Sequence, residues 1–220
     1  MPKPYFDIQQ FGEQADIYIF GNITNCAGDE NGTSAHSLVQ QLKTLQNAAE
    51  LNVHVDSYGG SVSEGWAIYN TLRDSKARVT SYADGFVASA AIYPFLAGHE
   101  RIASNLSAFY FHPATNCAGG YAEDLRKAAD NLDQLTEIGL GAFTNAGMAE
   151  QDARELINSK SWYSPATMLE KGIVTSIRKA EKSSDVAQSA QELIVQQLLA
   201  LPAEPPAPAK LSLMQMLCNI

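Results

Sequence analysis

Asp56-Ser57-Tyr58-Gly59-Gly60-Ser61-Val62 opens the part of this sequence that decides the fold, and two further stretches complete it. They are Gly85-Phe86-Val87-Ala88-Ser89-Ala90-Ala91 and Phe109-Tyr110-Phe111-His112-Pro113. The first predicts a glycine turn with available backbone N–H groups, the second a serine that starts an apolar helix, and the third a histidine that ends an apolar strand. Together they are the parts of a serine hydrolase site: oxyanion donors, nucleophile and general base.

Each of these pieces has a commoner structural explanation when it is taken alone. A Gly-Gly pair is usually a turn, and a serine among alanines is usually a packing residue or a helix cap. A histidine after three aromatic residues is usually a strand-end residue whose ring is satisfied locally. The order of the three pieces and their context along the chain favour chemistry instead.

The composition indicates a globular protein with an acidic surface. The chain has 220 residues, of which 45% are apolar and 18% charged, and its formal net charge is −9. We expect one domain with some additional sequence, and neither nucleic acid nor an anionic membrane as partner, because neither attracts an acidic surface. No run of about 18 apolar residues predicts a membrane span, and Met1-Pro2-Lys3-Pro4 lacks the apolar core of a signal peptide.

The cysteines and histidines do not form a recognisable metal motif. Cys26, Cys117 and Cys218 are odd in number and widely spaced, so they predict neither a disulfide framework nor a zinc site. The histidines are scattered, with no pair at metal-ligand spacing. We therefore expect a cytoplasmic protein with free thiols and no metal site.

Strand and helix patterns alternate along most of the chain, which predicts crossover units and a mainly parallel sheet of the α/β class. In such sheets ligands bind beyond the carboxyl ends of the strands, and both Gly59-Gly60 and Ser89 follow predicted strands directly. The expected strands are residues 16–20, 52–56, 78–82, 101–103, 107–111 and, as a strand or extended segment, 173–177; the expected helices are about 33–49, 63–74, 89–96, 122–145, 150–158 and 165–172.

The predicted helix of residues 122–145 is long for a domain of this size. At about 1.5 Å per residue it would measure about 35 Å and project beyond the core. Its apolar stripe would pack on a partner chain or cover the chain's own core, and both alternatives stay open. The stripe consists of Leu125, Ala128, Ala129, Leu132, Leu135 and Ile138. Gly139 and Gly141 lie within it and weaken the helix prediction toward its end.

The composition changes after about Lys182, which divides the chain into a domain of residues 1–182 and a tail of residues 183–220. Residues 186–201 predict an amphipathic helix, and residues 202–208 contain four prolines and predict an extended linker. The tail cannot form a core of its own, so it is either disordered or an interaction segment that engages scaffold.

The chain resembles the Clp-type serine proteases, the ClpP-like proteolytic-subunit family, over about residues 16–177. The resemblance implies a crotonase-like spiral of βαβ units with a projecting long helix. The small core, the short N-terminal extension and the extra tail are more similar to the phage branch of this family, whose members act as head maturation proteases. Five segments match in the correct order: Tyr18-Ile19-Phe20-Gly21, Asp56 to Val62, Gly85 to Ala90, Phe111-His112-Pro113, and Pro165-Ala166 to Gly172-Ile173-Val174.

Carried over position by position, the resemblance implies that Ser89 is the nucleophile and His112 the general base. The backbone N–H groups of Gly60 and Ala90 would form the oxyanion hole. Gly59, Ser61 and Val62 would bind an extended peptide by strand addition. This implies a serine endopeptidase that works through an acyl-enzyme on Ser89, with no metal and no organic cofactor.

The sequence departs from the family pattern at two positions. The family's third catalytic residue, an acid, aligns with Lys160, whose ammonium group cannot accept a hydrogen bond from an imidazole N–H. The orienting residue is therefore missing, displaced, or replaced by a carbonyl or a water. Pro94 lies inside the predicted helix after Ser89 and should kink or shorten it. Polar residues near Lys160 that do not match the motif are Asp152, Glu155, Asn158, Ser159 and Ser161.

The resemblance also implies partners and a location. We expect a homo-oligomer of one ring or of stacked rings, with the helix of residues 122–145 in the contacts between subunits. The substrates would be peptides or proteins, among them capsid and scaffold proteins if the enzyme is phage-encoded and acts in the host cytoplasm.

Two other classes of function compete with the peptidase. The first is a scaffold or assembly protein with a degenerate active site, which Lys160 and the tail favour. The second is a crotonase-like acyl-CoA enzyme, which shares the sheet topology and the paired oxyanion donors. The pairing of Ser89 with His112 and the lack of an evident basic site for nucleotide phosphates count against that enzyme, and a CoA-binding assay separates it from the others.

Overall fold

The computed structural model describes residues 6–25, 32–45 and 47–178. The predicted tail of residues 183–220 lies outside the described residues, as do Cys26 and Cys218. The division of the chain at residue 182 therefore stays a prediction. Within the described ranges, no helix is long and apolar enough to cross a membrane.

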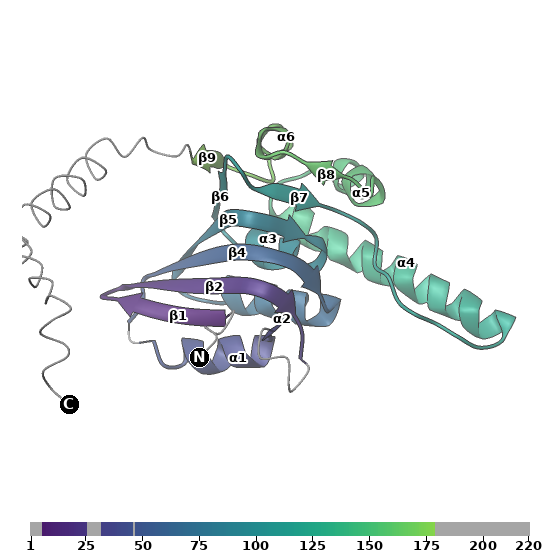
Figure 1. The fold of residues 1–220 in the computed structure, drawn as a ribbon, viewed down its shortest axis with the longest axis horizontal. Helices are drawn as coiled ribbons and strands as arrows, with labels where there is room; N and C mark the ends of the chain where they lie inside the picture. The colour runs from purple at the N-terminus through teal and green to yellow at the C-terminus, as the bar shows by residue number, and fades with distance from the viewer. Residues whose placement is uncertain (1–5, 26–31, 46, 179–220) are drawn as a thin grey trace, which may run out of the picture. The chain divides into compact units, whose positions relative to one another are not determined.

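A mainly parallel β-sheet forms the centre of the domain (Figure 1), which confirms the α/β prediction. Strands β2, β4, β5, β6 and β9 run parallel in that order, and β1 adds to β2 antiparallel at the edge. Off this path, β3 pairs with β2, β7 with β5, and β8 with β7. The strand bounds are β1 Phe6–Phe11, β2 Gln14–Ile23, β3 Gly32–Thr33, β4 Glu50–Gly60, β5 Arg78–Ala88, β6 Glu100–Ser104, β7 Ala108–Tyr110, β8 Trp162–Tyr163 and β9 Ser176–Arg178.

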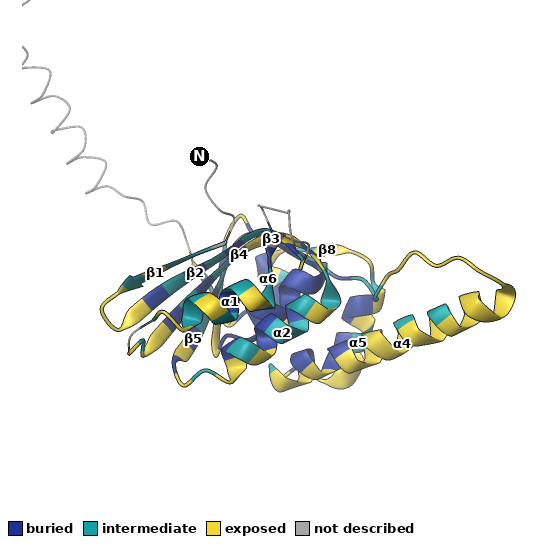
Figure 2. Cartoon of the chain, turned by 90° about the horizontal axis from the view of Figure 1, so that it is seen from below, coloured by how far each residue is buried: buried dark blue, intermediate teal, exposed yellow. Residues whose placement is uncertain are grey.

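Helices α1 (Ala35–Leu42), α2 (Val62–Arg73) and α3 (Ile92–Leu96) cover one face of the sheet (Figures 1 and 2). The long helix α4 (Ala122–Asn145) projects away from the sheet, as the sequence predicts. Helices α5 (Glu150–Asn158) and α6 (Pro165–Glu170) lie near β7 and β8. The carboxyl ends of β4 and β5 therefore lie next to the C-terminal part of α4.

The core lies between the sheet and helices α1 to α3, where Figure 2 shows the buried residues gathered. Along β2, Ile17 and Ile19 are fully buried, whereas Tyr18 between them stays partly exposed. The sheet register places Ile17 beside Val53 of β4 and Ile19 beside Val55, so alternate residues of neighbouring strands fill one apolar layer.

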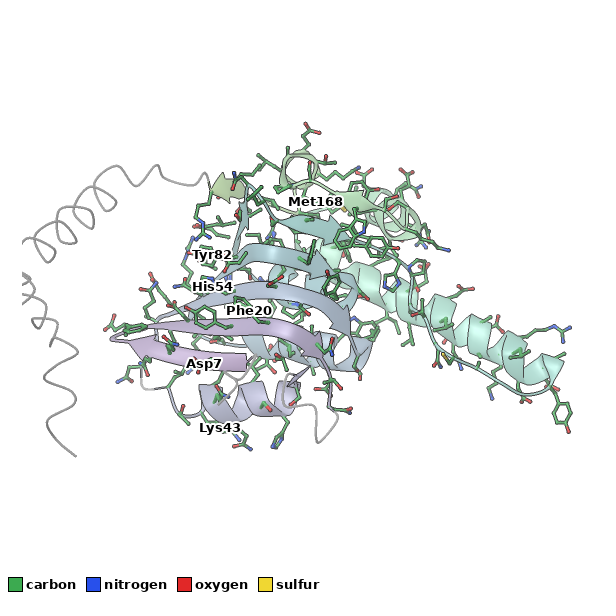
Figure 3. All side chains as sticks on the ribbon, viewed as in Figure 1. Asp7, Phe20, Lys43, His54, Tyr82 and Met168 are labelled. Atoms are coloured by element: carbon green, nitrogen blue, oxygen red, sulfur yellow. The ribbon has the colours of Figure 1, made fainter. Side chains whose placement is uncertain are left out.

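The other face of the sheet carries a stack of aromatic rings. The His54 ring lies between those of Tyr18 and Tyr82, with ring centroids 4.8 and 4.7 Å apart. The Nδ1 atom of His54 lies 2.6 Å from one carboxylate oxygen of Asp84. The other carboxylate oxygen of Asp84 accepts a hydrogen bond from Arg178 at 3.0 Å. Figure 3 shows His54 and Tyr82 side by side on neighbouring strands.

Several predicted boundaries are wrong; the strand predicted for residues 78–82, for example, continues to Ala88. Two further differences have a local cause. The helix predicted for residues 33–49 ends at Leu42, because the chain turns after Lys43 and passes through a positive φ of 55° at Asn47 before β4 begins. The turn predicted at Tyr58-Gly59-Gly60 is instead the end of β4, with Gly60 paired to Ile23 of β2. Strands β1, β3 and β8 were not expected from the sequence.

The structure explains the glycine inside one predicted helix and the short length of another. Helix α4 continues through Gly139, where the glycine makes room for the buried Tyr93 hydroxyl that a Cβ would strike. The segment predicted as a helix over residues 89–96 consists of a short 3-10 helix (Ser89–Ala91) followed by the five-residue α3, which contains Pro94. Pro94 was expected to shorten this helix, and the helix is short.

Candidate active site

Ser89 occupies a sharp turn where strand β5 gives way to the 3-10 helix. Ala88 is still extended, with φ −120° and ψ 145°, but Ser89 has a φ of 54°. The left-handed region is unfavourable for a residue with a Cβ, at a cost of about 1 kcal/mol, and such conformations cluster at functional sites. This turn brings the half-buried Ser89 side chain to the carboxyl end of the sheet.

The glycines at the end of β4 allow two chain segments to approach each other closely. Gly59 and Gly60 have positive φ values of 93° and 141°. A Cβ at Gly59 would come within 2.7 Å of the Ala90 nitrogen and 2.8 Å of the Ser89 Cβ, and a Cβ at Gly60 would strike the Ile23 carbonyl. Because no side chain fits at either position, the backbone of β4 lies directly against the segment that carries Ser89.

The buried Ser57 hydroxyl holds the end of β4 in this shape. It donates a 2.5 Å hydrogen bond to the carbonyl of Gly21 and accepts one from the Gly59 N–H at 3.0 Å. The register of β2 and β4 shifts at this point, so Ser57 joins the two strands where their regular ladder is interrupted. The sequence alone does not predict this role for Ser57.

His112 follows β7 and enters the same region from the other side. Its Nδ1 atom lies 2.6 Å from the carbonyl oxygen of the next residue, Pro113. Because a carbonyl can only accept, a hydrogen bond here requires a proton on Nδ1, and in the neutral ring Nε2 then keeps a free lone pair. The Tyr110 ring lies beside the imidazole, with 5.7 Å between the ring centroids.

One pocket brings most of the predicted site residues together. Its lining includes Gly60, Val62, Ser89, Ala90 and His112, which come from three segments far apart in sequence. No hydrogen bond joins the Ser89 hydroxyl to the His112 ring within the described part of the chain, although both side chains face this pocket. Such contacts are often long in free enzymes and shorten when substrate binds.

Gly59 and Ser61 are the predicted site residues that do not line the pocket. Gly59 lies behind it, against Ser89. The Ser61 side chain caps α2 by accepting from the Glu64 N–H at 3.4 Å, and its own N–H donates to the Ile23 carbonyl at 2.8 Å. The Ser61 N–H is therefore already used within the sheet and is not available to pair with a peptide.

Comparisons with known proteins agree with this geometry. The family model described as Clp protease matches residues 17–181. The chain belongs to the Clp protease family.

Two curated relatives carry the name ATP-dependent Clp protease proteolytic subunit 2. The protein from Treponema pallidum (strain Nichols) is 27% identical over 185 residues, which cover 81% of this chain and 88% of the relative. The protein from Treponema denticola is 26% identical over 162 residues, which cover 71% and 81%.

A solved structure of a ClpP1 mutant from Listeria monocytogenes shares the fold with a TM-score of 0.63 at 20% identity. The match covers 77% of this chain and 92% of that one. The ClpP-like, crotonase-like fold is thereby confirmed, and membership of the Clp protease family indicates a serine-type peptidase.

Lys160, which the resemblance aligns with the family's acid, is exposed and has a φ of 50°. Among the described residues that line the pocket, none is an aspartate or a glutamate. The orienting acid of the Clp protease pattern is therefore not replaced by a carboxylate from elsewhere in that lining.

The apolar wall of the pocket comes from helices that the sequence analysis did not connect with the site. The side chains of Leu135 and Phe143 reach it from α4, and that of Ile157 reaches it from α5. Leu135 belongs to the predicted apolar stripe of α4, which is the one signal that the sequence offered. Tyr93 adds a phenol whose pKa is raised by burial, so this hydroxyl stays protonated.

No cluster of three or more His, Cys, Asp or Glu side chains arranged to hold a metal ion occurs within the described ranges. Cys117, in the link before α4, is an exposed free thiol.

Proposed function

We propose that this protein is a serine endopeptidase that cleaves peptide bonds through an acyl-enzyme on Ser89, with His112 as general base. The observation that supports it best is the convergence of Ser89, His112, Gly60 and Ala90 on one pocket, with Ser89 on a strained turn. The reaction needs no metal and no organic cofactor.

In this mechanism His112 begins as the neutral tautomer with its proton on Nδ1. Its Nε2 takes the proton of the Ser89 hydroxyl as Oγ attacks the carbonyl carbon of the scissile peptide bond. The imidazolium then gives that proton to the leaving amine, and the acyl-enzyme remains on Ser89. Water repeats the two steps to release the acid product and restore the free serine.

The negative oxygen of the tetrahedral intermediate would lie between the backbone N–H groups of Gly60 and Ala90. Donors that are held in place before the reaction stabilise this charge without reorganising, and each such donor contributes about 100-fold or more to turnover. Ser57 fixes the end of β4 against β2, and the close contact of Gly59 with Ser89 holds the Gly60 and Ala90 segments together, which supports this assignment.

The lining of the pocket indicates the kind of substrate side chain that fits beside the scissile bond. Leu135, Phe143 and Ile157 provide apolar surface, and no charged side chain lines the described pocket when His112 is neutral. We propose that an apolar side chain of the substrate occupies this space, because its burial is favourable and a charged group would lose hydration without a partner.

Labelling with a fluorophosphonate tests the nucleophile. Covalent modification of the wild-type chain that is lost in Ser89→Ala and retained in Ser75→Ala supports an activated Ser89. Ser75 is a suitable control because it lies between α2 and β5 and does not line the pocket. Absence of labelling in a folded and assembled preparation would contradict the proposal.

The proposal extends to assembly and biological role. We propose a homo-oligomeric ring, single or stacked, with helix α4 in the contacts between subunits. We further propose a phage head maturation protease that acts on capsid and scaffold proteins in the host cytoplasm, which rests on the resemblance to that branch. Cutting of the chain's own tail after about residue 187 would support this role, and an intact C-terminus in active preparations, read by mass spectrometry, would contradict it.

A scaffold or assembly protein with a degenerate site is the second candidate. It is favoured by Lys160 at the acid position and by the lack of a carboxylate among the described lining residues. This candidate predicts the same assembly in wild-type protein and Ser89→Ala, with no acylation of either.

A further inference from the structure

The imidazole of His112 contacts the peptide unit that joins Pro113 to Ala114. The carbonyl of this unit lies 2.6 Å from the Nδ1 atom of His112. The N–H of the same unit donates a 3.0 Å hydrogen bond to the hydroxyl oxygen of Thr136 on helix α4. Both ends of one peptide group are therefore engaged, one by the histidine and the other by the helix.

We infer that the Pro113 carbonyl, held in place by Thr136, performs the orienting role that an acid performs in the family pattern. The inference rests on the proposed peptidase function and assigns a positioning residue to that site. A peptide unit is planar, and its N–H points opposite to its C=O. By holding the Ala114 N–H, Thr136 therefore aims the Pro113 carbonyl at His112.

Thr136 is itself fixed by the helix that carries it. Its hydroxyl donates to the carbonyl of Leu132, one turn earlier in α4, at 2.9 Å. The hydroxyl thus donates one hydrogen bond and accepts another, and the Thr136 side chain cannot change its rotamer without losing both. A continuous series of hydrogen bonds runs from Leu132 through Thr136 and the Pro113–Ala114 peptide to His112.

The chemistry of a carbonyl suits part of the role of the missing acid. Like a carboxylate, it only accepts hydrogen bonds, so it selects the tautomer of His112 that has the proton on Nδ1 and a free lone pair on Nε2. Unlike a carboxylate, it is neutral and stabilises the imidazolium less. The charged groups beside this loop line a neighbouring cavity: Asp133, Glu137 and Arg154, of which Glu137 and Arg154 form an ion pair.

The tautomer of His112 is the most direct test, because it can be observed without turnover. Solid-state NMR of the full-length assembly with ¹⁵N-labelled histidine, at a pH where the ring is neutral, distinguishes a protonated Nδ1 from a protonated Nε2. The His112→Gln variant identifies the signals. We expect a protonated Nδ1 in the wild-type chain, and a protonated Nε2 would overturn the inference.

Variants of Thr136 test the link to α4. Thr136→Val keeps the side-chain shape but removes the hydroxyl, so we expect a mixture of tautomers and a fall of about tenfold in kcat and in fluorophosphonate acylation, with little change in KM. Thr136→Ser should restore both the tautomer and the rate. Thr144→Val removes a comparable hydroxyl on the same helix, bonded to the Gly141 carbonyl at 3.1 Å, and should change neither.

The outcomes separate this inference from the proposed function. One outcome is that Nδ1 is protonated in the wild-type chain, that Thr136→Val gives a mixture of tautomers, and that Ser89 is never acylated. This outcome supports the orienting role and contradicts the peptidase. Acylation of Ser89 that Thr136→Val leaves unchanged, in protein shown to be folded, supports the peptidase and overturns the inference.

Discussion

Gly59 lies directly against Ser89. A Cβ at residue 59 would come within 2.8 Å of the Ser89 Cβ and within 2.6 Å of the Ala88 carbonyl oxygen. The left-handed turn at Ser89 and the positive φ at Gly59 therefore lie at the same contact, where the end of β4 packs against the end of β5.

Gly59→Ala should disrupt the site more than it disrupts the fold. The methyl group would push the Ser89 segment away from β4 and misplace the Ala90 N–H, so we expect acylation by a fluorophosphonate to fall by about 100-fold or more. The control is Gly119→Ala, which adds a methyl group with no atom within 4 Å. Acylation of Gly59→Ala at the wild-type rate would show that this contact does not position the nucleophile.

Lys160 should contribute little to activity. It is exposed and does not line the pocket, so we expect Lys160→Ala to change the acylation rate by less than about threefold, within the range of an ordinary surface substitution. Lys171→Ala, at the end of α6, removes the same charge from another exposed position. A tenfold loss confined to Lys160→Ala would mean that the loop after α5 takes part in the reaction.

Arg101 should be important for stability. Its buried guanidinium donates to the backbone carbonyls of Gly98, Ala146, Gly172 and Ile173, which lie in three loops far apart in the sequence. Arg101→Met would leave these carbonyls without their donor, and we expect the free energy of unfolding to fall by about 3 kcal/mol in urea titrations.

Arg78→Met is the matched control for Arg101. It removes an exposed arginine that pairs with Glu100, and exposed pairs contribute less than about 1 kcal/mol. Equal losses for the two variants would contradict the assigned role of Arg101.

The Asp84 carboxylate should stabilise the protein at neutral pH, and this contribution should be lost in acid. Burial by itself would raise the pKa of this carboxyl, but the hydrogen bond and charge of His54, together with Arg178, lower it below its usual range. A lowered pKa in the folded state stabilises the protein above the pKa of the unfolded chain, about 4, and this contribution is lost as the pH falls through the folded value.

We therefore expect Asp84→Asn to lower the free energy of unfolding by about 1 kcal/mol at neutral pH and by less at about pH 3. Asp74→Asn, at the end of α2, serves as the control, because the Asp74 side chain is exposed. A difference between wild-type protein and Asp84→Asn that stays constant between these pH values would exclude the proposed linkage.

The apolar side chains that α4 exposes should support assembly. Leu125 is 45% exposed and Ile138 is 63% exposed, although both belong to the predicted apolar stripe. We expect the double variant Leu125→Asp and Ile138→Asp to sediment as smaller species than the wild type, because charges would be buried in the contact. Leu106, in the turn between β6 and β7, is 86% exposed, and Leu106→Asp should sediment like the wild type.

Much of the fold follows from local patterns in the sequence. The β-branched strands and the helices α2, α5 and α6 are found close to their predicted positions, because each depends on residues a few positions apart. The end of α1 and the continuation of β4 through Gly60 were not predicted, because contacts with β2 and a turn at Asn47 decide them.

The candidate site divides in the same way. The motifs and the family resemblance that they carry predicted Ser89, His112, Gly60 and Ala90, because a nucleophile, a base and small residues for close backbone approach each leave a mark in a short stretch of sequence. Only the tertiary structure showed that Leu135, Phe143 and Ile157 form the wall of the pocket and that Pro113 and Thr136 hold His112. These contacts join residues whose spacing along the chain carries no signal, so packing in three dimensions decided them.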